Sequence, residues 1–249
     1  MSRSIIDVRN SLLFLLSLFS GISLSFSQNV PVFHTGEMKQ LHQKGFAVAT
    51  VNLDTLEKDH LYALGPVAHL QGEVFAWDVK VFVASLSKEQ KRPFVSKNPE
   101  AVSAIFLVYS YVSKWDTIKL NLKTMNLSEL EREIELNAHV QGLDTSKPFP
   151  FLMLGAFSKA KGHIVFADTP TSQIKPGNLE PYKHYYDFSS QKVQLLGFYS
   201  NHHQGVFTHH GSKLHIHYRM FNKYEAGHLD EISFDGSKTV LLLLPAAIQ

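Results

Sequence analysis

The sequence predicts an α+β protein that is mostly β, with a mixed β-sheet domain and a few helices packed against a smaller antiparallel β-barrel-like domain. Residues 70–83 alternate apolar with polar or small side chains, and residues 105–112 are apolar almost throughout, as strands of a sheet would be. From Phe149 onward helical periodicity disappears and strand-like runs alternate with turns. We therefore expect the two domains over residues 28–148 and 149–249.

The amino-terminal half combines short helices with strands. A helix is expected over residues 38–44, ended by Gly45, and a strand over 46–51 follows it. Asp54 and Glu57 form a capping pair that would open a second short helix.

One further helix is the most strongly indicated. Ser128 and Glu131 have the spacing of a capping box, and apolar residues recur at helical spacing after them. We therefore predict a helix over residues 129–138.

The carboxyl-terminal half reads as strands throughout. The expected strands cover residues 151–157, 163–166, 191–199, 212–221, 228–234 and 239–244. The proline-containing segment 169–182 is a long irregular connection, of the kind that commonly borders a site.

Composition narrows the function classes. The 249 residues are 44% hydrophobic and 18% charged, with a formal net charge of +2, which is typical of a globular protein. Nucleic acid is not an expected partner, because Lys and Arg are interspersed with Asp and Glu. The absence of cysteine excludes thiolate ligands, disulfides and thiol nucleophiles.

The first 27 residues have the pattern of a signal peptide. Arg3 and Arg9 precede an apolar run over residues 12–24, and Ser25 and Ser27 are small residues before a cleavage point. The rival reading is a membrane anchor, but the run is shorter than the roughly 20 apolar residues that a span needs. We expect cleavage near Ser27, export to the periplasm or the exterior, and no stable membrane span afterwards.

A cluster of histidines is the strongest functional signal. Seven of the 14 histidines fall between His202 and His228. In an extended strand, His215 and His217 point to the same face about 6.5 to 7 Å apart at Cα, so both can reach one ion. A hairpin over residues 222–227 would return His228 beside them. Three neutral imidazoles suit Zn²⁺ and leave one coordination position open, which is typical of a catalytic site.

Neighbouring polar residues have open roles. The pattern favours His209 and His210 as solvated turn residues over hydrogen-bond donors to the ligands or a second metal site. The same interpretation applies to His202 and His203. Asp230 either orients a ligand histidine or caps a strand end.

These residues resemble the carboxyl-terminal signature of bacterial acetolactate decarboxylases, in which a His-x-His strand is followed by a segment such as Gly227-His228-Leu229-Asp230 and three histidines hold zinc. The similarity extends over most of the chain that follows the leader. Leu70-Gln71-Gly72-Glu73 resembles the family's Leu-Asp-Gly-Glu hairpin, which places Glu73 at the active-site glutamate. The strand ending in Gly155-Ala156-Phe157 and the segment Leu196-Gly197-Phe198 also resemble the family.

Three positions depart from the family's pattern. The strand that ends in Gly-x-Phe carries an arginine in the family, where this chain has Leu152 and Met153. The family has an acidic residue just past its final Leu-Pro, which nothing matches after Pro245. Its Gly-Thr-Phe is Gly65-Pro66-Val67 here. The metal ligands are therefore better matched than the charged partners of the reaction.

The resemblance implies a zinc-dependent decarboxylase that converts 2-acetolactate, a small 2-hydroxy-3-oxo acid, to acetoin and CO₂. Zinc would act as a Lewis acid, and Glu73 would move the proton. Read without the resemblance, Glu73 is an exposed turn residue. The alternative is a catalytically impaired or non-catalytic zinc-binding relative. The oligomeric state stays open, a homodimer included. A cupin-type oxygenase is disfavoured because residues 220–222 lack the glutamate that it needs.

Overall fold

Two six-stranded sheets form most of the protein, in a computed structural model that describes residues 29–89, 91–121, 126–221, 225–234 and 239–246. The predicted signal peptide lies outside the described residues. No helix in the described part of the chain is long and apolar enough to cross a membrane.

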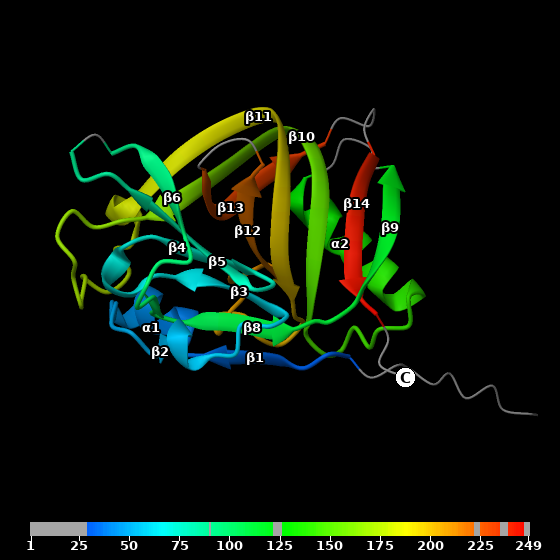
Figure 1. Cartoon of the computed structure of the whole chain (residues 1–249), viewed down its shortest axis with the longest axis horizontal. Coiled ribbons are helices and arrows are strands. Elements are labelled where there is room, and N and C mark those ends of the chain that lie inside the picture. Colours follow the sequence, from blue (N-terminus) through cyan, green and yellow to red (C-terminus); the bar gives the residue numbers. More distant parts are fainter. Residues whose placement is uncertain (1–28, 90, 122–125, 222–224, 235–238, 247–249) are drawn as a thin grey trace, which may run out of the picture.

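The first sheet has the order β1-β8-β3-β4-β5-β6 (Figure 1). Its strands are β1 (Val32–Thr35), β8 (Leu107–Tyr111), β3 (Leu61–Pro66), β4 (Glu73–Trp77), β5 (Lys80–Leu86) and β6 (Pro93–Lys97). A separate pair joins β2 (Val51–Asn52) to β7 (Ser103–Ala104).

The second sheet has the order β11-β12-β13-β10-β14-β9. Its strands are β11 (Lys183–Tyr199), β12 (Leu214–Met220), β13 (Ala226–Ser233), β10 (Phe149–Val165), β14 (Thr239–Pro245) and β9 (Trp115–Asn121). Because β10 also pairs with β11, the pairing runs from β10 through β11, β12 and β13 back to β10. These four strands are therefore joined in a closed circuit of pairings.

The predicted fold class, α+β and mostly β, is confirmed. The first sheet is antiparallel between its named strands, however, and not mixed. The reason is connectivity: β3, β4, β5 and β6 follow one another through short turns, which join only antiparallel neighbours. The domain division at residue 148 stays a prediction, and β9 and α2 (Leu127–Val140), which precede it, pack with the second sheet.

The helices follow the prediction with shifted caps. α1 (Met38–Lys44) ends at Gly45, whose φ of 73° lies in the left-handed region that glycine adopts readily. The capping box of α2 is formed by Asn126 and Glu129, not by Ser128 and Glu131. Glu131 instead accepts hydrogen bonds from the Lys213 backbone N–H and the Ser212 hydroxyl.

Other boundaries also differ from the prediction. The segment after Asp54 forms only a 3-10 turn, Leu53–Thr55, because the Asn52 side chain accepts from the Asp54 N–H in place of an α-helical cap. Of the strand expected over 46–51, only Val51 is paired in a strand. The runs expected over 151–157 and 163–166 belong to the single strand β10, which ends at Val165.

An apolar core joins the two sheets. Leu64 and Phe75 of the first sheet pack in one cluster with Leu152, Leu196 and Phe198 of the second. A larger cluster fills the space between α2 and the second sheet. Figure 1 shows the β10–β11 ribbon running from the side of β14 toward the first sheet. The ribbon therefore carries its far end to the junction where β4 begins.

Candidate metal centre

The three predicted ligand histidines lie together at this junction. β12 holds His215 and His217 two residues apart, and antiparallel pairing places His228 of β13 opposite His217. The His215 ring centroid lies 5.1 Å from those of both His217 and His228, and the latter two lie 5.4 Å apart. All three side chains are buried. The expected return of His228 beside the pair is thus seen in the strand pairing.

Each histidine of the His-x-His strand has a ring nitrogen with no hydrogen-bond partner among the described residues. The Nδ1 of His217 donates to the carbonyl oxygen of Val74 at 2.7 Å, which leaves its Nε2 as a lone-pair donor. That Nε2 and the Nδ1 of His215 are buried and unpartnered. Buried polar atoms normally find partners, so two such nitrogens in one cluster could serve as ligands of a metal ion.

Burial keeps these imidazoles neutral. Desolvation lowers the pKa of His217 to about 3, although the bond to Val74 raises it in part. It lowers the pKa of His209 to about 4 and holds the pKa values of His215 and His228 well below the ordinary range. Metal ions bind the neutral imidazole, so the cluster is ready for a cation at neutral pH.

Glu73 is buried beside this cluster, not exposed as its turn context alone would suggest. It is the first residue of β4 and is 3% exposed. Its Oε1 accepts from the Val165 N–H at 3.1 Å, and its Oε2 lies 3.7 Å from the His217 Nε2. Burial raises the pKa of Glu73 to about 8, against the lowering effect of the bond to Val165. The carboxyl group therefore faces the same space as the orphaned nitrogen.

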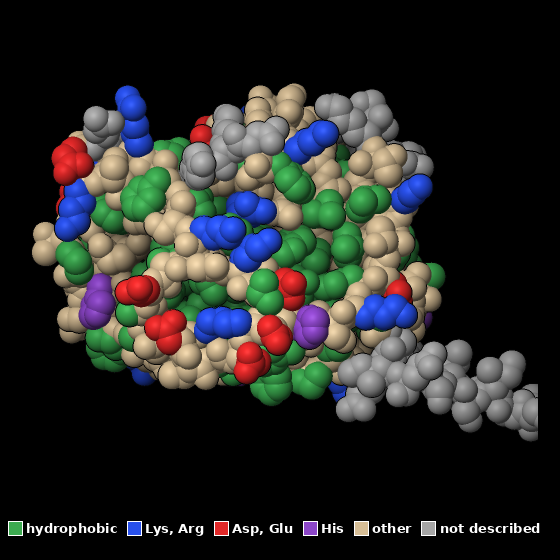
Figure 2. All heavy atoms as spheres, viewed as in Figure 1, with side chains coloured by type: hydrophobic (Ala, Val, Ile, Leu, Met, Phe, Trp, Pro, Cys, Tyr) green, Lys and Arg blue, Asp and Glu red, His purple; other side chains and the backbone are tan. Residues whose placement is uncertain are grey.

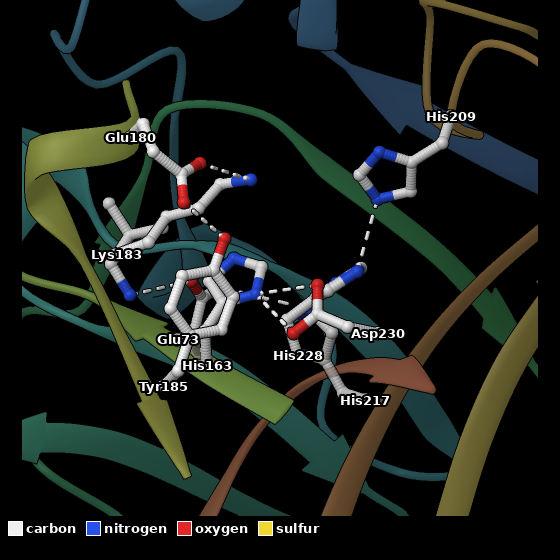
Figure 3. Close-up of polar contacts among 10 residues, drawn as sticks. Glu73, His163, Glu180, Lys183, Tyr185, His209, His217, His228 and Asp230 are labelled. Carbon is white, nitrogen blue, oxygen red and sulfur yellow. Dashed lines mark hydrogen bonds and ion pairs between the residues drawn. The ribbon is translucent and has the colours of Figure 1, made fainter. Parts of the chain in front are cut away.

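His209 belongs to the cluster, contrary to its reading as a solvated turn residue. Its Nε2 lies 3.1 Å from the Nε2 of His228, a contact that is drawn as a dashed line in Figure 3. Donor nitrogens of His209, His215 and His228 all lie within 4.8 Å of one another, and His217 is not part of this tightest set. Its neighbour His210 is exposed, as are His202 and Gln204. His203 packs on Phe207 away from this set, at 4.6 Å between ring centroids.

His163 is a member that sequence reasoning missed. It lies on β10 directly opposite His228, with ring centroids 4.8 Å apart. Its Nδ1 donates to the Asp230 carboxylate at 2.7 and 2.9 Å, so Asp230 orients this histidine rather than a predicted ligand. His163, His228 and Asp230 form a second set whose donor atoms lie within 4.8 Å.

Two glycines allow this close approach of β10 and β13. A Cβ on Gly162 would lie 2.5 Å from the carbonyl oxygen of His228, and one on Gly227 would lie 2.6 Å from that of His163. Each glycine thus makes room for the backbone of the other strand's histidine. The two Gly-His dipeptides are the sequence signal that could have identified His163.

The cluster lines a small cavity of about 30 Å³. His209, His215, His228 and Glu73 face apolar residues of α1 there, and Lys183 is the one Lys or Arg among the described residues of its lining. Lys183 pairs with Glu180 at 3.5 Å. Few histidine side chains appear on the face shown in Figure 2, where hydrophobic, basic and acidic side chains are intermixed. The cavity has room for about one water molecule.

Solved structures share this fold. A Staphylococcus aureus protein of unknown function, described as similar to α-acetolactate decarboxylase, aligns at a TM-score of 0.65 and 16% identity, over 85% of this chain and 84% of that one. The α-acetolactate decarboxylase of Bacillus subtilis strain 168 aligns at 0.68 and 15%, over 86% and 85%. The acetolactate decarboxylase of Bacillus subtilis subspecies spizizenii aligns at 0.65 and 14%, over 86% and 85%.

Comparisons of sequence give no such match: no protein-family model and no curated protein matches the chain. At 14–16% identity the solved structures establish a shared fold. The resemblance to acetolactate decarboxylases predicted from the sequence is confirmed at that level.

Proposed function

We propose that the protein is a zinc-dependent decarboxylase that converts 2-acetolactate to acetoin and CO₂. The observation that carries the proposal is the pair of orphaned ring nitrogens on His215 and His217, next to His228 and to a buried carboxyl group. The shared fold with acetolactate decarboxylases supports the choice of reaction.

The residues present fit a zinc ion. His215, His217 and His228 supply neutral imidazole nitrogens, the ligand type that zinc takes in catalytic sites. The hydrogen bond from His217 to Val74 orients one ring, in the way that supporting bonds to carbonyl groups orient ligand histidines. Bound zinc would supply Lewis acidity at the hydroxyl and keto oxygens of the substrate.

Glu73 is the proposed catalytic proton carrier. Loss of CO₂ from a 3-oxo acid leaves negative charge that a proton must neutralise at the same carbon. The Glu73 carboxyl faces the ligand cluster at 3.7 Å from His217, and the Val165 N–H holds its other oxygen in place. The group is therefore fixed where it can deliver a proton to a substrate held by the histidine site.

Lys183 is the proposed partner of the substrate carboxylate. The family's arginine has no counterpart at Leu152, because that side chain is buried in the apolar core between the sheets. Lys183 begins β11 and lines the same cavity as Glu73 and His228. It supplies the positive charge from a different strand, at a position 20% exposed to solvent.

The small cavity favours a second candidate, a zinc-binding relative without turnover. A space for about one water molecule does not hold a 2-hydroxy-3-oxo acid unless side chains move. In this alternative the histidines retain the ion, while Glu73 and Lys183 have no substrate to act on.

Metal analysis combined with turnover separates the two. The purified protein is loaded with zinc, its zinc content is measured, and acetoin and CO₂ are assayed with 2-acetolactate. The decarboxylase predicts one zinc per chain and product formation that falls by about 10²–10⁴ in Glu73→Gln with zinc retained. One tightly bound zinc without acetoin supports the non-catalytic relative, and no bound zinc rejects both.

A further inference from the structure

His209 differs from the other histidines of the cluster in where it is attached. His215, His217 and His228 project from strands, whereas His209 lies in the segment 200–213 that connects β11 to β12. Local backbone bonds shape this segment, such as that from the Thr208 N–H to the His203 carbonyl oxygen at 3.1 Å. The Val206 carbonyl accepts from the Met38 N–H at 2.7 Å, which docks the segment on α1.

The separation of His209 and His228 fits two ligands of one ion. Two nitrogens bound to a tetrahedral zinc at about 2.0–2.1 Å lie about 3.3–3.4 Å apart. The two Nε2 atoms are 3.1 Å apart, and one ring nitrogen from each of His209, His215 and His228 lies within 4.8 Å of the other two. The competing account is an N–H···N hydrogen bond between the two rings, which needs no metal.

His209 would also decide whether a bound ion keeps an open position. Three strand histidines would leave zinc with one ligand fewer than the four it usually takes, and His209 would supply the fourth. His209 lines the same cavity of about 30 Å³ as Glu73 and Lys183. A single side chain thus takes up both the open coordination position and part of the space that a substrate needs.

We propose that His209 is a fourth nitrogen ligand, supplied by the connecting segment, which closes the metal site at rest and leaves it when an oxygen-chelating ligand enters. The proposal rests on the zinc site proposed above. His209 is the ligand that exchanges because it belongs to a connection, while the strand ladder fixes the other three.

X-ray absorption of the zinc-loaded protein tests this directly, because scattering from the outer ring atoms counts bound imidazoles. We expect four imidazoles in the wild type and three in His209→Ala. The exposed neighbour His210 provides the matched control, His210→Ala, which keeps all four. Chelator competition should show zinc affinity reduced at least about tenfold in His209→Ala and unchanged in His210→Ala.

Two further arms keep the outcome interpretable. Acetohydroxamate, a small bidentate oxygen ligand, should displace one imidazole from the wild type and none from His209→Ala. Equal imidazole counts and affinities in His209→Ala and His210→Ala would overturn the proposal while leaving the three-histidine site intact. His217→Ala removes a proposed ligand, so loss of zinc from this variant shows that the measured zinc is bound at the histidine cluster. A wild type that binds no zinc overturns both this proposal and the proposed function.

Discussion

His217 of β12 donates its Nδ1 proton to the carbonyl oxygen of Val74 of β4 at 2.7 Å, so the backbone of the first sheet sets the ring orientation of a histidine in the second. The bond crosses the junction between the sheets at the candidate metal centre. It links the geometry of the metal cluster to the packing of the whole protein.

Replacing His217 by alanine tests this link. Loss of a group that only supports a ligand lowers metal affinity roughly 10–100-fold. Because His217 is a proposed ligand, we expect zinc affinity to fall by more than this. The metal-free protein should also lose stability, because a buried acceptor left without its donor costs about 1–3 kcal/mol. Chelator competition and urea unfolding measure the two effects. An unchanged zinc affinity relative to His210→Ala would remove His217 from the ligand set.

Lys183→Gln tests the proposed carboxylate partner. Loss of a positive charge facing an anionic substrate should lower kcat/KM for 2-acetolactate by about 10²–10³, with zinc content unchanged. Lys175 is exposed in the connection that precedes β11, so Lys175→Gln is the matched control and should keep the wild-type value. Equal kinetics for the two variants would show that Lys183 does not contact the substrate.

The pH dependence of stability isolates Glu73 in the metal-free protein. Burial raises its pKa from 4.5 to about 8, so the folded state holds a proton that the unfolded state releases between these values. The stability from this proton is fully present below pH 4.5 and is lost as pH rises through 8. The free energy of unfolding of the wild type should therefore fall relative to Glu73→Gln, by up to about 1.4 kcal/mol per pH unit within this window.

The buried histidines act with the opposite sign, since their lowered pKa values remove stability as pH falls from 6.5. Both proteins share them, so the difference between the two unfolding curves cancels their contribution. Parallel curves across pH 5–8 would contradict a buried neutral carboxyl group at Glu73.

Gly162→Ala tests the close approach of β10 and β13. The added methyl group would overlap the Tyr218 ring and lie 2.5 Å from the carbonyl oxygen of His228, so the strand must shift. We expect a loss of about 1–3 kcal/mol in unfolding free energy and weaker zinc binding. For Gly155→Ala on the same strand the nearest atoms belong to Val240, none closer than 3.1 Å, so this change should cost less. Equal losses would argue against a special role for Gly162.

Local patterns predicted much of the fold and part of the site. The period-two spacing of His215 and His217 fixes a shared face whatever the tertiary structure, and the hairpin returns His228 by pairing rules alone. The resemblance added Glu73, whose burial depends on Val165 of a strand far away in the sequence. The histidines were thus found from local spacing, and Glu73 from the resemblance to a known family.

The missed residues depend on contacts that no local pattern encodes. His209 reaches His228 because its connecting segment docks on α1, and His163 meets His228 through pairing of β10 with β13. The sequence pattern places the capping box of α2 two residues too late, because Asn126 and Ser128 each precede a glutamate by three residues and only Asn126 forms the cap. Lys183 lines the cavity from the first position of β11. The periodicity of the sequence does not define where this strand begins, because a long connection precedes it.

The reciprocal packing of Gly162 and Gly227 also bears on how relatives can be recognised. Each glycine is required by the backbone of the other dipeptide's histidine, so neither can change alone without displacing the partner strand. Chains that keep this pair of strands in contact should therefore keep both glycines, even at the 14–16% identity that this chain shares with the solved structures. Replacement of one glycine should thus be accompanied by a shift of the strand opposite it.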